Sequence, residues 1–90
     1  MTNKRTRARK PYMEECILLG VINSQTVDIS KWGLGVEVED VTLPIKNGDK
    51  LSAYIKKIQH GSLTQVQWIT KDFKNNTIRL GLKLFSSLLD

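Results

Sequence analysis

The segment IRLGLKL, residues 78–84, places an apolar side chain at every second position, with a charged residue or glycine between them. This period of two is the pattern of a β-strand that has one apolar face and one solvated face. The same alternation is found upstream, in residues 25–30, 34–38, 51–55 and 64–68. The chain therefore reads as a series of short strands.

Clusters of turn-forming residues separate these strands: NSQ at 23–25, NGD at 47–49, HGS at 60–62 and NN at 75–76. With a mixed polar and apolar run at 14–22, the pattern predicts six strands and an all-β fold. A sheet built from only 90 residues must curl to cover its own core. We therefore predict a six-stranded antiparallel β-barrel, followed by a short helix of about one turn at residues 85–89.

The alternation also assigns one side of each strand to the core. The residues that we predict to point inward lie on the apolar face of their strand: Val27, Ile29, Leu34, Val36, Leu51, Ile55, Val66, Trp68, Leu80 and Leu82. Asp28 and Ser30 occupy the other phase of their strand, so we expect them to point away from this core.

The composition is typical of a small single-domain protein. The chain is 40% hydrophobic, which suffices for one small core and not for two. The lone cysteine, Cys16, excludes an internal disulfide framework and fits a reducing compartment. The longest uncharged apolar run, residues 16–22, is far shorter than the roughly 20 residues of a membrane span. We therefore expect a cytoplasmic protein without membrane insertion.

The positive charge is concentrated at the N-terminus. Five of the 14 Lys and Arg residues lie within residues 1–10, which contain no acid: Lys4, Arg5, Arg7, Arg9 and Lys10. The remaining bases equal the nine acids in number. We predict a basic N-terminal arm at residues 1–11 and a β-barrel domain at residues 12–90. Without ligand the arm is expected to be mobile, because its cations repel one another and it has little apolar surface.

Residues capable of catalysis are few. The single histidine, His60, lies in a predicted turn and is interpreted as solvated. Cys16 lies in an apolar run, where a free cysteine usually serves as a small core side chain. The sequence contains no familiar nucleophile, metal-binding or phosphate-loop motif. We therefore predict that the protein is not an enzyme and holds no metal or cofactor.

Within the arm, Arg5, Arg7 and Arg9 alternate with small residues. In an extended backbone these three side chains point the same way, about 6.6–7 Å apart. A guanidinium group presents a planar fork of donors that matches a phosphate or the O6/N7 edge of guanine. Three arginines with two lysines favour shaped recognition over attraction by charge alone, although a solvated basic tail would show the same residues.

A second polar motif is Asp28-x-Ser30-x-x-Gly33. Asp28 and Ser30 leave the same face of a strand and form an acceptor pair that complements the two adjacent N–H donors of the guanine Watson–Crick edge. Gly33 permits either a positive φ or a close backbone approach. An ordinary Asp/Ser turn is the alternative interpretation.

Together, Arg5-x-x-x-Arg9 and Asp28-x-Ser30-x-x-Gly33 resemble the two-part signature of PilZ domains, the bacterial receptors for cyclic di-GMP. The similarity continues through residues 33–36, 48–51, 66–68 and 79–85, so that it covers residues 4–85. The resemblance implies a six-stranded split barrel with a flexible arm and a short C-terminal helix.

It also implies a site and a function. Arg5 and Arg9 would grip phosphates and guanines, and the arm would wrap over a ligand on the outer face of the barrel. Asp28 and Ser30 would hold a guanine edge, and Gly33 would let the base approach the backbone. The protein would bind cyclic di-GMP and change its surface to regulate a protein partner in motility, biofilm or exopolysaccharide pathways.

Three positions depart from the family pattern. Lys4 stands where many relatives carry an arginine, in a neighbourhood that bears on whether one ligand or a stacked pair is bound. Arg7 is an extra cation inside the motif, either a ligand contact or solvated. Trp32 replaces a residue that is often small, and it either stacks on a guanine or packs against the end of the barrel, with packing the favoured interpretation.

Two other functions fit the sequence less well. The first is a small β-barrel that binds single-stranded nucleic acid and uses the arm as an electrostatic tether. Such barrels expose aromatic side chains, whereas Trp68 and Phe85 are interpreted here as internal, which makes a nucleic-acid partner the weaker hypothesis. The second is a barrel that acts only through protein contacts, which ranks last because the arginines are present.

Overall fold

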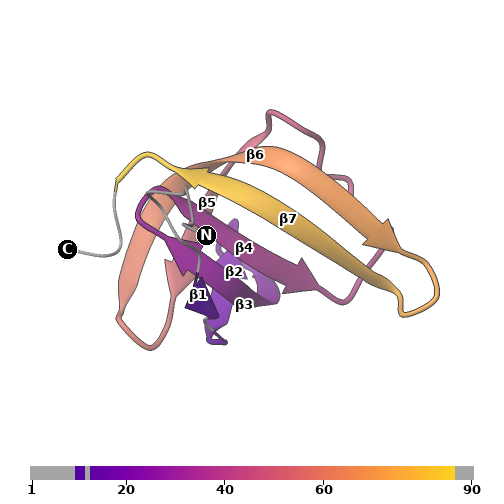
Figure 1. Ribbon diagram of the computed structural model, residues 1–90, viewed down its shortest axis with the longest axis horizontal. Coiled ribbons are helices and arrows are strands. Elements are labelled where there is room, and N and C mark those ends of the chain that lie inside the picture. The colour runs from indigo at the N-terminus through magenta and orange to yellow at the C-terminus, as the bar shows by residue number, and fades with distance from the viewer. Residues whose placement is uncertain (1–9, 12, 87–90) are drawn as a thin grey trace, which may run out of the picture.

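The computed structural model describes residues 10–11 and 13–86 of the chain. The strands are β1 (Lys10–Pro11), β2 (Glu15–Leu18), β3 (Ile22–Ser30), β4 (Gly33–Val38), β5 (Lys50–Ile55), β6 (His60–Asp72) and β7 (Thr77–Leu84) (Figure 1). The described residues contain no helix. Of the predicted 85–89 helix, Phe85 and Ser86 form a bend, and the rest lies outside the described residues.

Six of these strands form a closed antiparallel ring. The order around it is β3, β2, β5, β6, β7 and β4, and β4 pairs back with β3. The all-β fold and the six-stranded antiparallel barrel predicted from the alternation are thus confirmed. Closure gives every strand of the ring a neighbour on both sides, which suits a sheet this small.

The short strand β1 is not a member of this ring. It pairs antiparallel with the second half of β3, where Lys10 is opposite Ile29 and Pro11 is opposite Asp28. The first half of β3 pairs with β2 on the same side. The predicted division into an arm and a barrel domain at residues 11 and 12 stays a prediction. The arginines of the arm lie outside the described residues, so the expected mobility of the arm also stays a prediction.

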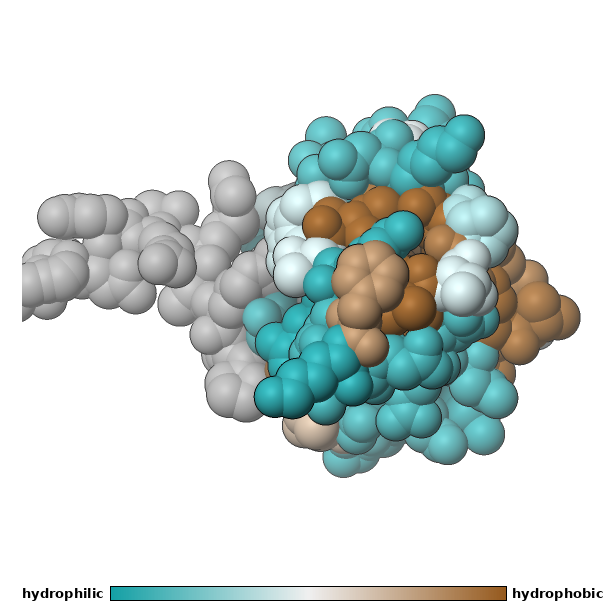
Figure 2. Space-filling model, turned by 90° about the vertical axis from the view of Figure 1, so that its right-hand side faces the viewer, coloured by the Kyte–Doolittle hydropathy of each residue, from teal (hydrophilic) through white to brown (hydrophobic). Residues whose placement is uncertain are grey.

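Buried apolar side chains fill the barrel: Cys16, Leu18, Ile29, Leu34, Val36, Val38, Ile45, Leu51, Ala53, Ile55, Val66, Ile78, Leu80, Leu82 and Leu84. In the segment between β4 and β5, Val41 and Leu43 pack against this core. Figure 2 looks at the barrel from the side where β6 ends in Figure 1 and shows apolar residues gathered inside a border of hydrophilic ones. The predicted inward set is confirmed except for Val27 and Trp68.

The prediction for Val27 is wrong because β3 contains a β-bulge. The register with β4 shifts between Thr26 and Asp28, which leaves Val27 without a partner. A bulge inserts one extra residue, so the inward phase changes by one position. Thr26 is therefore the buried residue, and its Oγ1 accepts a hydrogen bond of 2.7 Å from the backbone N–H of Glu14. This bond satisfies a hydroxyl that would otherwise be unfavourable in the core.

The prediction for Trp68 is wrong for the same physical reason. The register of β6 with β7 shifts between Val66 and Trp68, so Gln67 is the extra residue. Val66 is buried, but after the bulge it is Ile69 that packs against the core. Trp68 is consequently 43% exposed on the outer surface.

Candidate functional site

Part of the outer surface of β4 and β7 carries no side chains. Gly33 and Gly35 occupy the outward positions of β4, opposite Lys83 and Gly81 of β7. We call Gly33, Gly35 and Gly81 the glycine floor. All three glycines are buried although they point away from the core, so neighbouring groups must cover them.

One row of cross-strand neighbours crosses the glycine floor. Asp28 of β3 is paired with Gly35, Gly35 with Gly81, and Gly81 with Trp68 of β6. A Cβ atom on Gly35 would lie 2.6 Å from Oδ1 of Asp28. A Cβ atom on Gly81 would overlap Nε1 and Cε2 of Trp68. The carboxylate and the indole therefore lean over the bare backbone from opposite sides.

The next row along the barrel contains Ser30, Gly33, Lys83 and Gln65. Between this row and the Gly81–Trp68 end of the first row, the surface is hollowed into an open depression of about 490 Å³, which Asp28 and Gly35 do not line. Its lining combines two indoles with polar groups: Ser30, Trp32, Gly33, Gln67, Trp68, Gly81, Leu82 and Lys83. A depression with aromatic walls and a few polar groups can hold a planar polar ligand.

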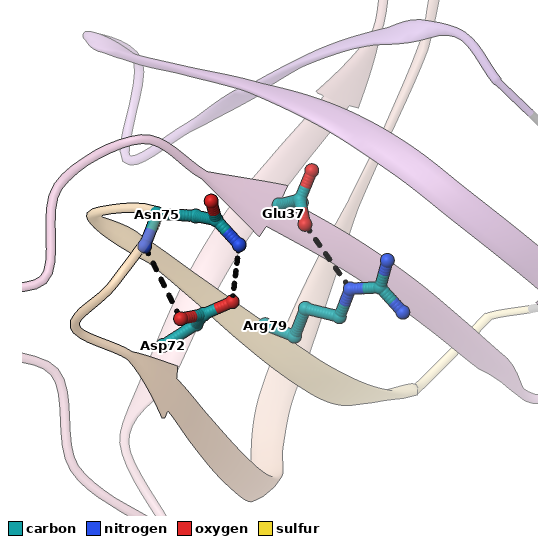
Figure 3. A network of polar contacts seen from close by, with 4 residues as sticks. All are labelled: Glu37, Asp72, Asn75 and Arg79. Carbon is teal, nitrogen blue, oxygen red and sulfur yellow. Dashed lines mark hydrogen bonds and ion pairs between the residues drawn. The ribbon is translucent and has the colours of Figure 1, made fainter.

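On the side of the Asp28–Trp68 row that faces away from the depression, the surface carries an ion pair. Arg79 Nε lies 3.1 Å from Glu37 Oε2, across β7 and β4 (Figure 3). Beyond it, Asp72 accepts hydrogen bonds from Asn75 in the β6–β7 turn. These hydrogen bonds, above all the one from the Asn75 side chain, keep the pKa of the Asp72 carboxyl below its usual value. Arg79 is thus engaged by Glu37, and this end of the surface is organised by the protein's own side chains.

The structure brings the second predicted motif to this surface. Ile29 points into the core, so Asp28 and Ser30 leave the outer side, where Asp28 is half-buried and Ser30 is buried. Gly33 does not have a positive φ, so the left-handed option is wrong. A close backbone approach is the remaining reason for a glycine there.

The arm residues Lys4, Arg5, Arg7 and Arg9 lie outside the described residues, and the structure does not test their roles. The backbone nevertheless shows where the arm joins the barrel. Lys10, which directly follows Arg9 in sequence, is paired with Ile29, between Asp28 and Ser30. The basic segment is therefore attached beside the second motif.

Of the two tryptophans, Trp68 differs from the sequence-based expectation, whereas both interpretations of Trp32 remain predictions. Trp32 is 42% exposed at the rim of the depression, with Nζ of Lys31 5.8 Å from its ring centroid. Trp68 was not predicted as a site residue at all. The one signal that would have found it is its pairing with Gly81, which depends on a bulge that the sequence does not reveal.

Comparison with known proteins places the fold but not the family. No family model and no curated protein matches the chain. A solved structure of the Bacillus subtilis inhibitor of motility (MotI/DgrA) is similar with a TM-score of 0.76 and 19% sequence identity. The match covers 98% of this chain and 46% of that one, so this chain spans less than half of its length. The likeness shows that the two proteins share a fold over nearly the whole of this chain.

The described residues contain no helix that is long and apolar enough to cross a lipid bilayer.

Proposed function

We propose that this protein is a receptor for cyclic di-GMP that regulates a protein partner and catalyses no reaction. The observation that carries the proposal is the row in which Asp28 and Trp68 face each other across Gly35 and Gly81. This row provides a carboxylate acceptor, an exposed aromatic ring and bare backbone within one surface. The basic arm joins the barrel at Asp28, where Pro11 is its partner.

The chemistry of the ligand matches these groups. The Watson–Crick edge of guanine presents two adjacent N–H donors, which an Asp28 carboxylate accepts. Gly33 lines the depression and has no side chain that would keep a planar base away from the backbone. Arg5 and Arg9 supply the forks of donors that bind phosphate groups bidentately. Trp32 and Lys83 line the depression beside this row.

The likeness to an inhibitor of motility supports a regulatory role. In this proposal the ligand orders the arm over the glycine floor, and the changed surface is recognised by a protein partner of a motility, biofilm or exopolysaccharide pathway in the cytoplasm. A barrel that works by exposing or covering a surface needs no catalytic residue.

A second candidate function is binding of single-stranded nucleic acid. The structure favours it more than the sequence did, because Trp68 and Phe85 are 43% and 46% exposed instead of internal. Nζ of Lys83 lies 5.6 Å from the ring centroid of Phe85. Exposed aromatic rings with nearby cations are typical of surfaces that stack unpaired bases. The two functions differ in the role that they give Asp28.

Calorimetric titration with cyclic di-GMP and with a short oligonucleotide separates the two functions. We expect Arg9→Ala and Asp28→Ala each to weaken cyclic di-GMP binding, because each removes charge-assisted hydrogen bonds of about 1.5–3 kcal/mol. This corresponds to a loss of about 10- to 150-fold in affinity. Arg9→Lys should also bind more weakly than the wild type, because lysine keeps the charge and lacks the planar fork.

The sign of the Asp28 effect is decisive. On a surface that attracts polyanions by charge alone, removing a negative charge strengthens binding. Tighter cyclic di-GMP binding by Asp28→Ala, or full affinity in Arg9→Lys, would contradict the proposal and leave the basic tail as the binding element. Oligonucleotide binding without cyclic di-GMP binding would establish the second function.

A further inference from the structure

Gly61 is exposed on the outer side of β6, and nothing in its own chain requires a glycine there. Its φ is not positive, so the β5–β6 turn does not depend on it. A Cβ atom would lie 3.5 Å from Cδ1 of Tyr54 and 3.6 Å from the carbonyl oxygen of Ala53, both ordinary contacts. A glycine inside a strand costs backbone entropy and often marks a close approach by another molecule. Such an approach would account for Gly61.

Gly61 belongs to a block of four outward residues in which large and small side chains alternate. Tyr54 of β5 is the cross-strand partner of Gly61, and Ser52 is the partner of Leu63. Tyr54 and Leu63 are 40% and 52% exposed, and they occupy one diagonal of the block. Ser52 and Gly61, which have little or no side chain, occupy the other diagonal. We call these four residues the β5–β6 face.

Further apolar side chains flank the β5–β6 face on both sides. The backbone N–H of Leu19 donates a hydrogen bond of 3.0 Å to the carbonyl of Ser52. On the other side, the N–H of Phe85 donates one of 3.3 Å to the carbonyl of Leu63. Leu19 and Phe85 are 49% and 46% exposed. With Tyr54 they present an apolar area on the order of a few hundred Å², the size of the largest patch on a typical monomer, which is often functional.

We propose that the β5–β6 face is the contact between two copies of this chain, related by a two-fold axis that runs between β5 and β6 and parallel to both. Such an axis sets each residue of one copy opposite the position of its cross-strand partner in the other copy. Tyr54 then lies over Gly61 of the second copy, and Leu63 lies over Ser52. Every bulky side chain meets a small residue, so the face is complementary to itself.

The residues around the face agree with this axis. Leu19 and Phe85 flank it on opposite sides, so the rotation brings these two apolar side chains together. In the next row Lys50 is the cross-strand partner of Gln65, and the rotation sets the ammonium group opposite the amide, so no like charges meet there. A different protein would have to supply both the bulky and the small positions of this pattern. A second copy supplies them by symmetry.

The size of the contact fits a reversible dimer. In a standard interface each partner buries about 800 Å², somewhat more than half of it apolar. A barrel is convex, so two barrels that touch along β5 and β6 bury less than this. We therefore expect monomer and dimer to exchange, with more dimer as the protein concentration rises. None of the four residues of the face lines the depression, so this inference does not depend on cyclic di-GMP binding.

Sedimentation equilibrium of the full chain, from about 10 µM to about 1 mM, measures the association. We expect the average mass to rise from that of the monomer toward twice that value. Gly61→Val should weaken the dimer by about 5- to 150-fold, because it overpacks a close contact. Phe73→Ala is the control, since it removes a side chain that is 74% exposed in the turn after β6 and should associate as the wild type does.

An exchange of the bulky and the small position tests the axis itself. Gly61→Tyr places two rings opposite one another, and Tyr54→Gly removes the ring that the other copy receives. Each variant alone should therefore dimerise more weakly than the wild type. Mixed in equal amounts, the two variants should associate again, because every ring then lies opposite a glycine. A role of either residue within the monomer alone would not restore association on mixing.

The outcomes decide the inference in either direction. A wild-type chain that stays monomeric up to about 1 mM overturns it and leaves the face to a different protein. A dimer that Gly61→Val does not weaken, or that Phe73→Ala weakens as much, also overturns it, because the contact would then lie elsewhere. Folded exchange variants that fail to associate on mixing overturn the proposed axis. If thermal melts show that these variants do not fold, the comparison of Gly61→Val with Phe73→Ala remains decisive.

Discussion

On two sides of the barrel, which we call walls, an outward aromatic residue is the cross-strand partner of a glycine. The two pairs differ in how closely the ring approaches the glycine backbone. On one wall Trp68 is opposite Gly81, and on the other Tyr54 is opposite Gly61. A Cβ atom on Gly61 would be 3.5 Å from Cδ1 of Tyr54, an ordinary contact. A Cβ atom on Gly81 would overlap the Trp68 indole. Only the first wall requires its glycine.

The difference shows which surface of the barrel is specialised. Around Gly81 a second glycine, Gly35, is covered by the side chain of Asp28, so a broad area of backbone carries only groups that lean in from the neighbouring strands. Around Gly61 the outward positions carry ordinary side chains, including Leu63 and Tyr54, both exposed. Both walls cover the same core, so their difference should appear in binding and local geometry more than in global stability.

The largest expected effect tests the shared core. Leu34 lies beneath the glycine floor and Leu18 beneath the opposite wall, and both are fully buried. We expect Leu34→Ala and Leu18→Ala each to lower the free energy of unfolding by about 2–5 kcal/mol, because each removes buried methyl groups and leaves a cavity. Urea denaturation measures both.

Leu63→Ala is the control for this pair, since Leu63 is 52% exposed. Surface substitutions of this kind usually change stability by less than about 0.5 kcal/mol. A loss confined to one of the two buried leucines would show that the walls do not share one cooperative core.

A smaller effect is expected from the two glycines. Gly61→Ala should be neutral or stabilising by up to about 1 kcal/mol, because alanine loses less backbone entropy on folding and meets no close neighbour. Gly81→Ala should destabilise by about 1 kcal/mol, since the new methyl group forces the indole aside. Thermal melts and tryptophan emission spectra report the two consequences. Equal melting temperatures and unshifted emission in both variants would remove the distinction between the walls.

The last expected effect is a dependence of stability on pH, and it concerns Cys16, which is buried beneath the Tyr54–Gly61 side of the barrel. Burial raises the pKa of the Cys16 thiol, an effect that hydrogen bonds from Ser24 and the Tyr54 backbone only partly offset. The unfolded chain therefore loses this proton at a lower pH than the folded protein. The stability contribution is complete below the ordinary thiol pKa of about 8.5 and declines as pH rises above it.

The comparison of wild type with Cys16→Ala isolates this contribution from the other titrating groups. The difference in free energy of unfolding between the two proteins should be constant from pH 6 to about 8 and shrink by at most about 1.4 kcal/mol per pH unit above the thiol pKa. A difference that does not change up to pH 10 would show that the thiol titrates alike in the folded and unfolded states.

The alternation of the sequence determined the fold class and most of the core. Leu34, Leu51 and Leu82 point inward because side chains of an extended chain alternate between faces, which is a local property of the backbone. The same argument placed Asp28 and Ser30 on the outer side. The roles of Asp28, Ser30, Arg5 and Arg9 in binding a ligand all remain predictions.

Only the tertiary structure decided what stands opposite those residues. The bulges at Val27 and Gln67 depend on how β3 and β6 are matched with β4 and β7, and a bulge reverses the phase of every residue beyond it. For this reason Thr26 is buried and Trp68 is exposed, against the local pattern. The meeting of Gly35 with Gly81 likewise arises from closure of the ring, because cross-strand neighbours are chosen by register between distant segments and not by either segment alone.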